Sequence, residues 1–568
     1  MKRLLSLSIL TASSLLAVSP NVDAIQNSIS TPKIVEDKNQ ENKNELIEIA
    51  GKKSYAPMMV DDKSGKKLYV KEFLIEGNEH VNSNELQDLI KDFKDKELSF
   101  SELQNLASIV TKEYREKGYF VARAYLPKQN LQENNDVLKI SVIEGTYGEF
   151  KLENNSNVKD FLVQAMLNDA KARDNVVSTD TLERSMLIIN DTPGAKVTQA
   201  DVKPGSEIGS SDFLIKTEKT PLYDGYVVAD NHGSKYTGKN RVMAGVNLNS
   251  PLKLGDKLSL SGLVSNGNDI ENYKTGYDFP LMANGLRGQI NYSKTNYDLV
   301  KLGQTTPDGI YDGYTKTYEA GITYPIIRTR LENLNFSSVY SNKELKDYYD
   351  EAVSKDREIN SVKIGLDYTK NHNLFGFDSV SKIESSYTLG KLNIKDEKSK
   401  NNDKNGVNTQ DTYSKVNLNF GNEMQFNPIY SLNANVKTQY ALKNKNLDGS
   451  EDFTLGGSEG VKVFSDGEQS VENAMVLNLE TFAQLPNVSN LNHKIGLFYD
   501  LGSGYMSNNE KDLEFERRTL QDVGVGYYTN YKNAFTKLQV ARVVGGQDIE
   551  TENVGNISRV LFQGGLVF

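Results

Sequence analysis

Two periods of hydrophobic residues divide the chain of 568 residues. Between residues 67 and 219, apolar residues recur every three or four positions in some stretches and alternate in others, which is typical of helices mixed with strands. From residue 220 to the C-terminus, alternation at period two dominates. The sequence therefore predicts an α+β region followed by a long β region with no helix between its strands.

The α+β region predicts two modules with the same order of elements, strand–helix–helix–strand–strand. The expected strands are 67–75, 120–126, 137–143, 147–152, 195–202 and 212–217. Two expected helices are capped by Asn82 or Ser83 and by Ser99 or Ser101, and two more span 158–170 and 179–189. Weak internal repetition of this kind indicates tandem modules rather than one enzyme domain. Such modules expose a sheet edge, to which an extended chain can add as a further strand.

The β region predicts about 16 strands of roughly 9–14 residues. In one of them Val362 and Ile364 share a face, while Lys363 and Asp367 lie on the other. An antiparallel sheet packed on its own core also alternates, but so many segments in series are typical of an outer-membrane barrel. Because a closed sheet pairs every backbone group, it can lie in lipid.

The expected links between these strands alternate in length. Short links are expected near 250–254, 281–284, 326–328, 371–375, 422–427, 486–491 and 531–533, and long polar links near 298–311, 343–357, 392–409, 444–472, 503–517 and 544–555. Such alternation is expected when one rim of a barrel faces the periplasm and the other faces the outside.

The N-terminus has the layout of a secretory signal peptide over residues 1–24. A basic start precedes an uncharged apolar run from Leu4 to Val18, and Ala24 ends a segment suited to cleavage. Residues 25–66 are polar, and they fit either a disordered leader or a weak helix over 34–50. The mature chain has left the cytoplasm, and it contains no G-x-x-x-x-G-K-[ST] phosphate-binding loop.

Composition excludes several classes of function. The absence of Cys rules out disulfides, thiolate metal sites, a Cys nucleophile and a lipoprotein anchor. The four His residues are too scattered to suggest a metal cluster, so no metal or cofactor is expected. A net charge of −10 argues against nucleic acid as a partner. Hydrophobic residues make up only 38% of the chain, which suits a barrel that shows lipid every second residue.

The order of local motifs resembles the outer-membrane transporters of two-partner secretion, the exporters of filamentous haemagglutinins and haemolysins. The matching segments are 114–119 (YREKGY), 124–129 (AYLPKQ), 142–145 (VIEG), 190–194 (NDTPG), 230–233 (DNHG) and 249–252 (NSPL). The resemblance implies a signal peptide (1–24), a polar segment with a plug helix and linker (25–66), two POTRA modules (67–145 and 146–219) and a 16-stranded antiparallel transmembrane barrel (220–568).

This resemblance also implies the function and the location. The POTRA modules would lie in the periplasm and capture an unfolded, β-rich exoprotein, such as an adhesin or a haemolysin-like protein with an N-terminal secretion domain. The barrel, in outer-membrane lipid, would pass that chain to the cell surface. The last strand, ending in Phe568, resembles the signal that the barrel assembly machinery recognises. The alternatives are a general insertase of the same superfamily, which predicts more POTRA repeats, and a passive porin, which predicts no soluble modules.

Two further motifs imply a latch between a loop and the barrel wall. The family's V-R-G-[YF] tetrad in a long loop corresponds here to Val461, Lys462, Val463 and Phe464, and its F-x-D-x-G motif corresponds to Phe498, Asp500 and Gly502. The resemblance implies that Lys462 pairs with Asp500 and holds the loop inside the barrel. Lysine lacks the arginine fork and Val463 lacks the freedom of glycine, so the latch is expected to be weaker or differently arranged. The alternatives are a solvated loop charge at Lys462 and an ordinary lumen acid at Asp500.

Residues 456–460 (GGSEG) fit the G-x-S-x-G pattern of a hydrolase. A nucleophile elbow needs a strand–turn–helix and a partner His. The expected setting here is a long barrel loop, so no catalytic residue is predicted and a surface hydrolase is rejected.

Overall fold

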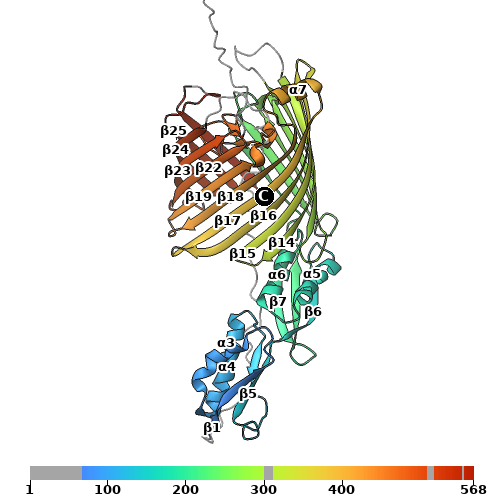
Figure 1. Cartoon of the computed structure of the whole chain (residues 1–568), viewed down its shortest axis with the longest axis vertical. Coiled ribbons are helices and arrows are strands. Elements are labelled where there is room, and N and C mark those ends of the chain that lie inside the picture. The colour runs from blue at the N-terminus through green and yellow to red at the C-terminus, as the bar shows by residue number, and fades with distance from the viewer. Residues whose placement is uncertain (1–66, 300–310, 508–516, 553–554) are drawn as a thin grey trace, which may run out of the picture.

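The computed structural model describes residues 67–299, 311–507, 517–552 and 555–568. Two small α+β modules follow one another below one rim of a closed β-barrel (Figure 1). The expected signal peptide, polar segment and helix over 34–50 lie outside the described residues. Within the described ranges, no helix is long and apolar enough to cross a membrane.

The first module contains a three-stranded sheet, a separate pair of short strands and two helices. Its elements are β1 (Lys67–Val70), β2 (Glu72–Glu76), α3 (Ser83–Ile90), β3 (Lys96–Ser99), α4 (Phe100–Glu116), β4 (Arg123–Tyr125) and β5 (Val137–Ile143). The sheet order is β2-β5-β4, with β2 parallel to β5, and β1 pairs separately with β3. Ser99 and Glu102 form a capping box at the start of α4, which satisfies backbone N–H groups that the first helical turn leaves unpaired.

The second module repeats this architecture. It contains β6 (Thr146–Asn155), α5 (Asp160–Arg173), α6 (Thr179–Asp191), β7 (Lys196–Pro204) and β8 (Ser210–Glu218). The sheet order β6-β8-β7 again places the third strand in the centre. In each module a helix glutamine donates to a carbonyl of the first strand, Gln87 to Phe73 at 2.8 Å and Gln164 to Phe150 at 3.4 Å. The opposite edge of each sheet is β4 or β7.

Sixteen antiparallel strands form the closed barrel. They are β9 (Tyr223–Asp230), β10 (Arg241–Asn249), β11 (Lys257–Ser265), β12 (Ile270–Pro280), β13 (Arg287–Leu299), β14 (Tyr311–Arg328), β15 (Glu332–Tyr349), β16 (Ala352–Leu374), β17 (Phe377–Ile394), β18 (Asp411–Gln425), β19 (Tyr430–Ala441), β22 (Asn473–Gln484), β23 (Asn492–Tyr505), β24 (Arg518–Tyr531), β25 (Ala534–Val543) and β26 (Ser558–Val567). Strand β26 pairs with β9 and closes the ring. The predicted fold class is confirmed.

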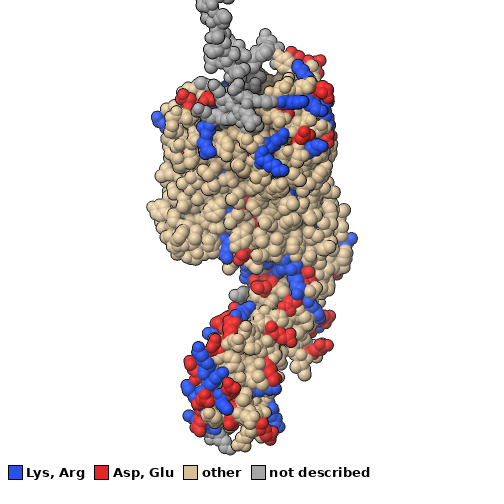
Figure 2. Space-filling view, in the orientation of Figure 1, with Lys and Arg blue, Asp and Glu red and all other residues tan. Residues whose placement is uncertain are grey.

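The outer wall of the barrel is apolar. Val362, Ile364 and Leu366 on β16 are exposed, as the alternation predicts. Figure 2 shows few charged side chains across the middle of the barrel and many on the two modules and at the far rim. Exposed aromatic residues gather at the ends and turns of strands on the rim beside the modules, namely Tyr223, Phe375, Phe426, Tyr430, Tyr531 and Phe568. A band of this kind, with aromatic residues at its border, is suited to lipid.

One predicted long link is a short turn, and another has the predicted length but contains a helix that was not expected. The long link expected near 343–357 is a two-residue turn, Asp350–Glu351, in which both residues have left-handed φ values of 48° and 62°. Polar strands continue to this turn, with an ion pair of 3.1 Å between Lys346 and Asp356. The link near 392–409 contains a helix, α7 (Glu397–Asn405), which Asp396 caps. Both segments lack an apolar face, so hydrophobic periodicity could not reveal them.

The second module is bound to the rim formed by the short turns. Arg328 at the end of β14 donates to both carboxylate oxygens of Asp191 in α6, at 2.7 and 2.8 Å. Gly285, in the turn between β12 and β13, has φ 94°, and a Cβ there would contact Ile188 of α6 at 2.6 Å. The close approach therefore requires glycine. Because the modules lie at the short-turn rim, the rim with the longer links faces away from them (Figure 1).

A histidine joins the two modules. His80 lies between Glu144 at the end of the first module, with Nδ1 2.6 Å from Oε2, and Asp174 after α5, with Nε2 3.2 Å from Oδ2. The Tyr114 hydroxyl also donates to Glu144, at 2.8 Å. Burial by itself lowers the pKa of His80. The hydrogen bond to Glu144 and the charges of Glu144 and Asp174 outweigh that effect, so the pKa of His80 is raised.

This contact predicts a joint between the modules that weakens as the pH rises. Because the folded-state pKa of His80 lies above 6.5, the stabilisation is complete at pH values below 6.5 and is lost as the pH rises through the folded-state pKa. The measured quantity is the rate at which a protease cleaves the full chain between the modules, divided by the rate for the variant His80→Gln at the same pH. We expect this ratio to be larger at pH 8.5 than at pH 6. Equal ratios at both pH values would contradict this expectation.

Candidate functional site

A long segment between β19 and β22 folds back into the barrel. We call residues 442–472 the inward loop; it includes the short strands β20 (Phe453–Thr454) and β21 (Ser470–Val471). Its buried apolar side chains join a cluster with the inner wall, which comprises Leu455, Val461, Val463, Phe464, Val471, Ala474, Val476, Phe498, Leu520, Ala541, Ile549 and Leu561. The wall residues come from β22 to β26, so the loop packs on the C-terminal half of the barrel.

The tip of the inward loop forms a buried ion pair with the wall. Lys462 Nζ donates to both carboxylate oxygens of Asp500 on β23, at 2.9 and 2.8 Å. The two residues are 5% and 0% exposed. Asn478 on β22 donates to the same carboxylate at 2.7 Å, and the Lys462 ammonium lies 4.5 Å from the centre of the Phe498 ring. The structure thus brings together the two residues that the resemblance pairs, and neither is a solvated charge.

The loop motif differs from the family pattern without strain. Val463 is absent from the residues with a left-handed φ, so the backbone does not need glycine there. Its N–H donates to Asp522 Oδ2 on β24, at 2.7 Å. Arg559 on β26 donates to the carbonyl of Phe464 at 2.6 Å. A guanidinium group therefore binds the tip from the last strand, although the tetrad itself has lysine.

Gly502 has a steric reason in this site. A Cβ at Gly502 would lie 2.9 Å from the side chain of Val461 in the loop. Any larger residue would push the tip away from β23. The glycine of the F-x-D-x-G motif thus provides room for the loop that the aspartate of the same motif binds.

Asp522 is a functional candidate that the sequence reasoning missed. It is fully buried and lies opposite Asp500 in the register of β23 and β24. The signal for this residue in the sequence is the alternation of β24, which places an acid on the inner face of the strand. The alternation does not show that this acid accepts a hydrogen bond from a backbone N–H of the loop tip.

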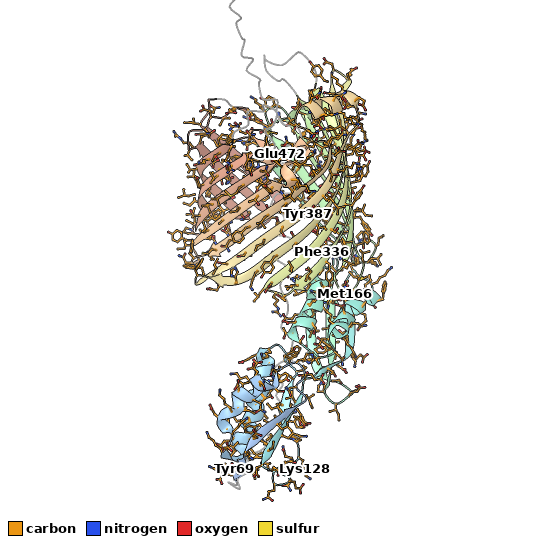
Figure 3. All side chains as sticks on the ribbon, in the orientation of Figure 1. Tyr69, Lys128, Met166, Phe336, Tyr387 and Glu472 are labelled. Atoms are coloured by element: carbon orange, nitrogen blue, oxygen red, sulfur yellow. The ribbon has the colours of Figure 1, made fainter. Side chains whose placement is uncertain are left out.

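Two other buried acids of the inward loop accept hydrogen bonds, one from the wall and from a link between strands, the other from backbone N–H groups of the loop and of the segment after β23. Glu468, 2% exposed, accepts from Arg518 Nη2 at 2.8 Å and from the Thr551 hydroxyl at 2.6 Å. Glu472 (labelled in Figure 3) accepts from the backbone N–H groups of Ser507 at 3.1 Å and Leu447 at 3.4 Å. These partners could not be predicted from the sequence, because most lie dozens of residues away along the chain.

A polar cavity of about 1740 Å³ runs beside the inward loop. Its lining reaches from Asp191 in α6 to Glu459 and Lys462 in the loop, and it includes residues of every strand from β14 to β19 and from β22 to β26. Lysines, carboxylates, amides and hydroxyls dominate this lining. The arrangement can hydrate a polar chain inside the barrel while the loop occupies the other half of the lumen.

The G-x-S-x-G segment has no hydrolase setting. Residues 456–460 lie between β20 and β21 inside the inward loop, not at a turn from a strand into a helix. Among the residues that the structure describes, no group of His, Asp and Glu side chains is arranged to hold a metal ion.

The family to which these features belong is found by comparison with known proteins. The family described as haemolysin secretion/activation protein ShlB/FhaC/HecB matches residues 209–527. The chain belongs to this family. A second match, a POTRA domain of the ShlB type, covers residues 68–145.

Relatives and solved structures agree with the family. The heme/hemopexin transporter protein HuxB of Haemophilus influenzae strain 86-028NP is 29% identical over 459 residues, which are 80% of this chain and 79% of that protein. The structure of CdiB from Escherichia coli, 19% identical, covers 98% of this chain and 100% of that one with a TM-score of 0.76. CdiB from Acinetobacter baumannii, 15% identical, covers 96% and 98% with a TM-score of 0.67.

The chain is therefore an outer-membrane transporter of two-partner secretion that exports a protein partner. Its POTRA modules lie in the periplasm, so the short-turn rim is the periplasmic rim and the opposite rim is extracellular. The family is one of transporters rather than of enzymes.

Proposed function

We propose that this transporter binds the unfolded N-terminal part of a β-rich exoprotein, an adhesin or a haemolysin-like protein, on its second POTRA module and passes it through the polar cavity to the cell surface. The observation that supports this path is the lining of the cavity. It begins at Asp191 of the second module and ends beside the inward loop. The module that binds the cargo thus also forms the entrance to the lumen.

The capture site in this proposal is the free edge of β7. Among the described strands only β8 pairs with β7, which is nine residues long. The corresponding strand of the first module, β4, has three residues. Beyond β4, the Gln129 side chain occupies the edge of β5 by bonding to both the N–H and the carbonyl of Lys139, at 2.8 Å each. An added strand gains backbone hydrogen bonds with little demand on sequence, and β7 offers the longer edge.

Cross-linking during secretion tests this capture site. A photo-reactive amino acid is placed at Lys203, exposed on β7, or at Lys171, exposed on α5 as the matched control. We expect the exoprotein to cross-link through position 203 and not through position 171, and secretion to continue in both variants before illumination. Cross-linking through position 171 alone, or through neither position while secretion continues, would contradict capture at β7.

Transit needs no nucleotide in this proposal. The exoprotein would be hydrated by the lumen and drawn outward by its own folding at the cell surface. The same proposal includes recognition of the last strand, ending in Phe568, by the barrel assembly machinery, and contact of the apolar outer wall with outer-membrane lipid. An insertase or a passive porin is not favoured, since two modules precede the barrel and the family is one of secretion.

A further inference from the structure

The base of the inward loop is bound to a different part of the barrel from its tip. Glu451 accepts from Lys343 on β15 at 2.8 Å and from Lys415 on β18 at 3.0 Å. Lys415 also donates to the Glu451 carbonyl at 2.7 Å, and Gln439 on β19 donates to the same carbonyl at 3.0 Å. The side chains of Glu451, Lys343 and Lys415 are 11%, 18% and 12% exposed, so most of each charge is removed from water.

A second pair lies three residues before the first. Asp448 accepts from Arg357 on β16 at 2.7 Å, and the other end of the same guanidinium donates to Asp347 on β15 at 2.9 Å. The side chains of Arg357 and Asp448 are each 6% exposed. We call Asp448 and Glu451 with these partners the base anchor, and Lys462 with Asp500 the tip anchor.

The two anchors hold different arcs of the ring. In the order of the barrel strands from β9, the base anchor uses Lys343 on the seventh strand and Lys415 on the tenth, whereas Asp500 is on the thirteenth and Arg559 on the sixteenth. The chain between Glu451 and Lys462 therefore joins the middle strands of the ring to its last four. Its midpoint contributes Gly456, Ser458 and Glu459 to the lining of the cavity.

We propose that the inward loop is a strap fixed at two places on the wall, in which Glu451 is a positioning residue that keeps the base of the loop in the lumen when the tip anchor is lost. A loop bound at one wall swings aside when its single contact breaks. A strap bound at two walls keeps its base in the lumen after either anchor breaks, and it leaves the lumen only after both. This device deepens the proposed function, because it implies that the exoprotein must displace both anchors to pass.

Thiol labelling tests the strap directly. The chain has no natural Cys, so Ser450→Cys provides a single thiol in the base anchor, where Ser450 is 3% exposed. In the purified full chain we expect Asp500→Ala to leave the labelling rate of this thiol within about twofold of the parent, because the base stays bound. Glu451→Gln is expected to raise the rate about tenfold, because the neutral amide no longer compensates the charges of the two lysines. The matched control is Glu384→Gln. Glu384 on β17 also lines the cavity, but its carboxylate accepts a hydrogen bond from Asn419 on β18 and not from the inward loop.

Conductance in planar bilayers gives the second readout. We expect Glu451→Gln and Asp500→Ala each to raise the frequency of open events, and the double variant to raise it by more than the product of the two single effects. Each variant must first show the heat-modifiable migration of a closed barrel. Wild-type labelling in Glu451→Gln, or a double variant that conducts like Asp500→Ala alone, would overturn the strap.

Both readouts use the chain without an exoprotein. Failure of the strap is therefore distinguishable from failure of capture at β7, which the cross-linking experiment measures separately. A strap that holds while cross-linking fails would leave the pore device in place and refute only the capture site.

Discussion

Replacing Asp500 with alanine is expected to raise pore conductance and to reduce secretion of the exoprotein. The change leaves the Lys462 ammonium, 5% exposed, without its carboxylate partner. Removing one partner of a buried ion pair costs about 3–5 kcal/mol. The tip of the inward loop recovers that free energy by moving Lys462 into water, so the tip leaves its part of the lumen while the base anchor still holds the rest of the loop. Planar bilayers measure the conductance, and the culture medium or the cell surface reports the secreted exoprotein.

The matched control for this variant is Asp367→Asn. Asp367 on β16 also lines the cavity, but it makes no hydrogen bond or ion pair to the inward loop in the described part of the chain. We expect it to conduct and secrete like the wild type. Wild-type behaviour of Asp500→Ala in both assays would refute the latch, whatever the outcome at Asp367.

Deleting residues 67–219 is expected to abolish secretion while leaving a folded, heat-modifiable barrel. The sixteen strands pair only with one another around the ring, so the barrel does not depend on the modules for the hydrogen bonds between its strands. What it loses is the rim contact of Arg328 with Asp191 and the free edge of β7. Migration with and without heating measures the barrel, and the exported protein measures secretion.

A shorter deletion separates the two modules. Removing residues 67–145 alone keeps β7 and the rim contact, so we expect secretion to fall without being abolished. Full secretion by the chain that lacks 67–219 would contradict any role of the modules in capture. Loss of heat modifiability in that chain would instead show that the barrel needs the modules to fold.

Local pattern was sufficient for the architecture and insufficient for the interior. Residues 361–368 predict a lipid-facing strand because every second side chain must be apolar there, and the α4 helix follows from Ser99 and its apolar spacing. The hairpin around Asp350 and the helix α7 lie outside the apolar belt, so polarity alone was misread as a long loop. Elements in water on all sides have no period that a sequence could show.

The site was predicted in part. Lys462 and Asp500 could be paired because both lie in motifs that the resemblance supplied, and alternation had already placed Asp500 on the inner face. Glu451 and Glu468 have no such motif. Their partners, Lys343 and Arg518, are far away in sequence. Which wall a loop acid reaches depends on how the barrel closes, and that information is in the three-dimensional arrangement alone.

The mixed lining of the cavity bears on which proteins can pass. Basic and acidic side chains occur in nearly equal numbers along it, so their fields largely cancel over a few Debye lengths. Neither an acidic nor a basic stretch of cargo meets a deep electrostatic well in which it would halt. We therefore expect such a conduit to discriminate little by the net charge of its cargo, and selection among secreted proteins to rest on the surface that first receives them.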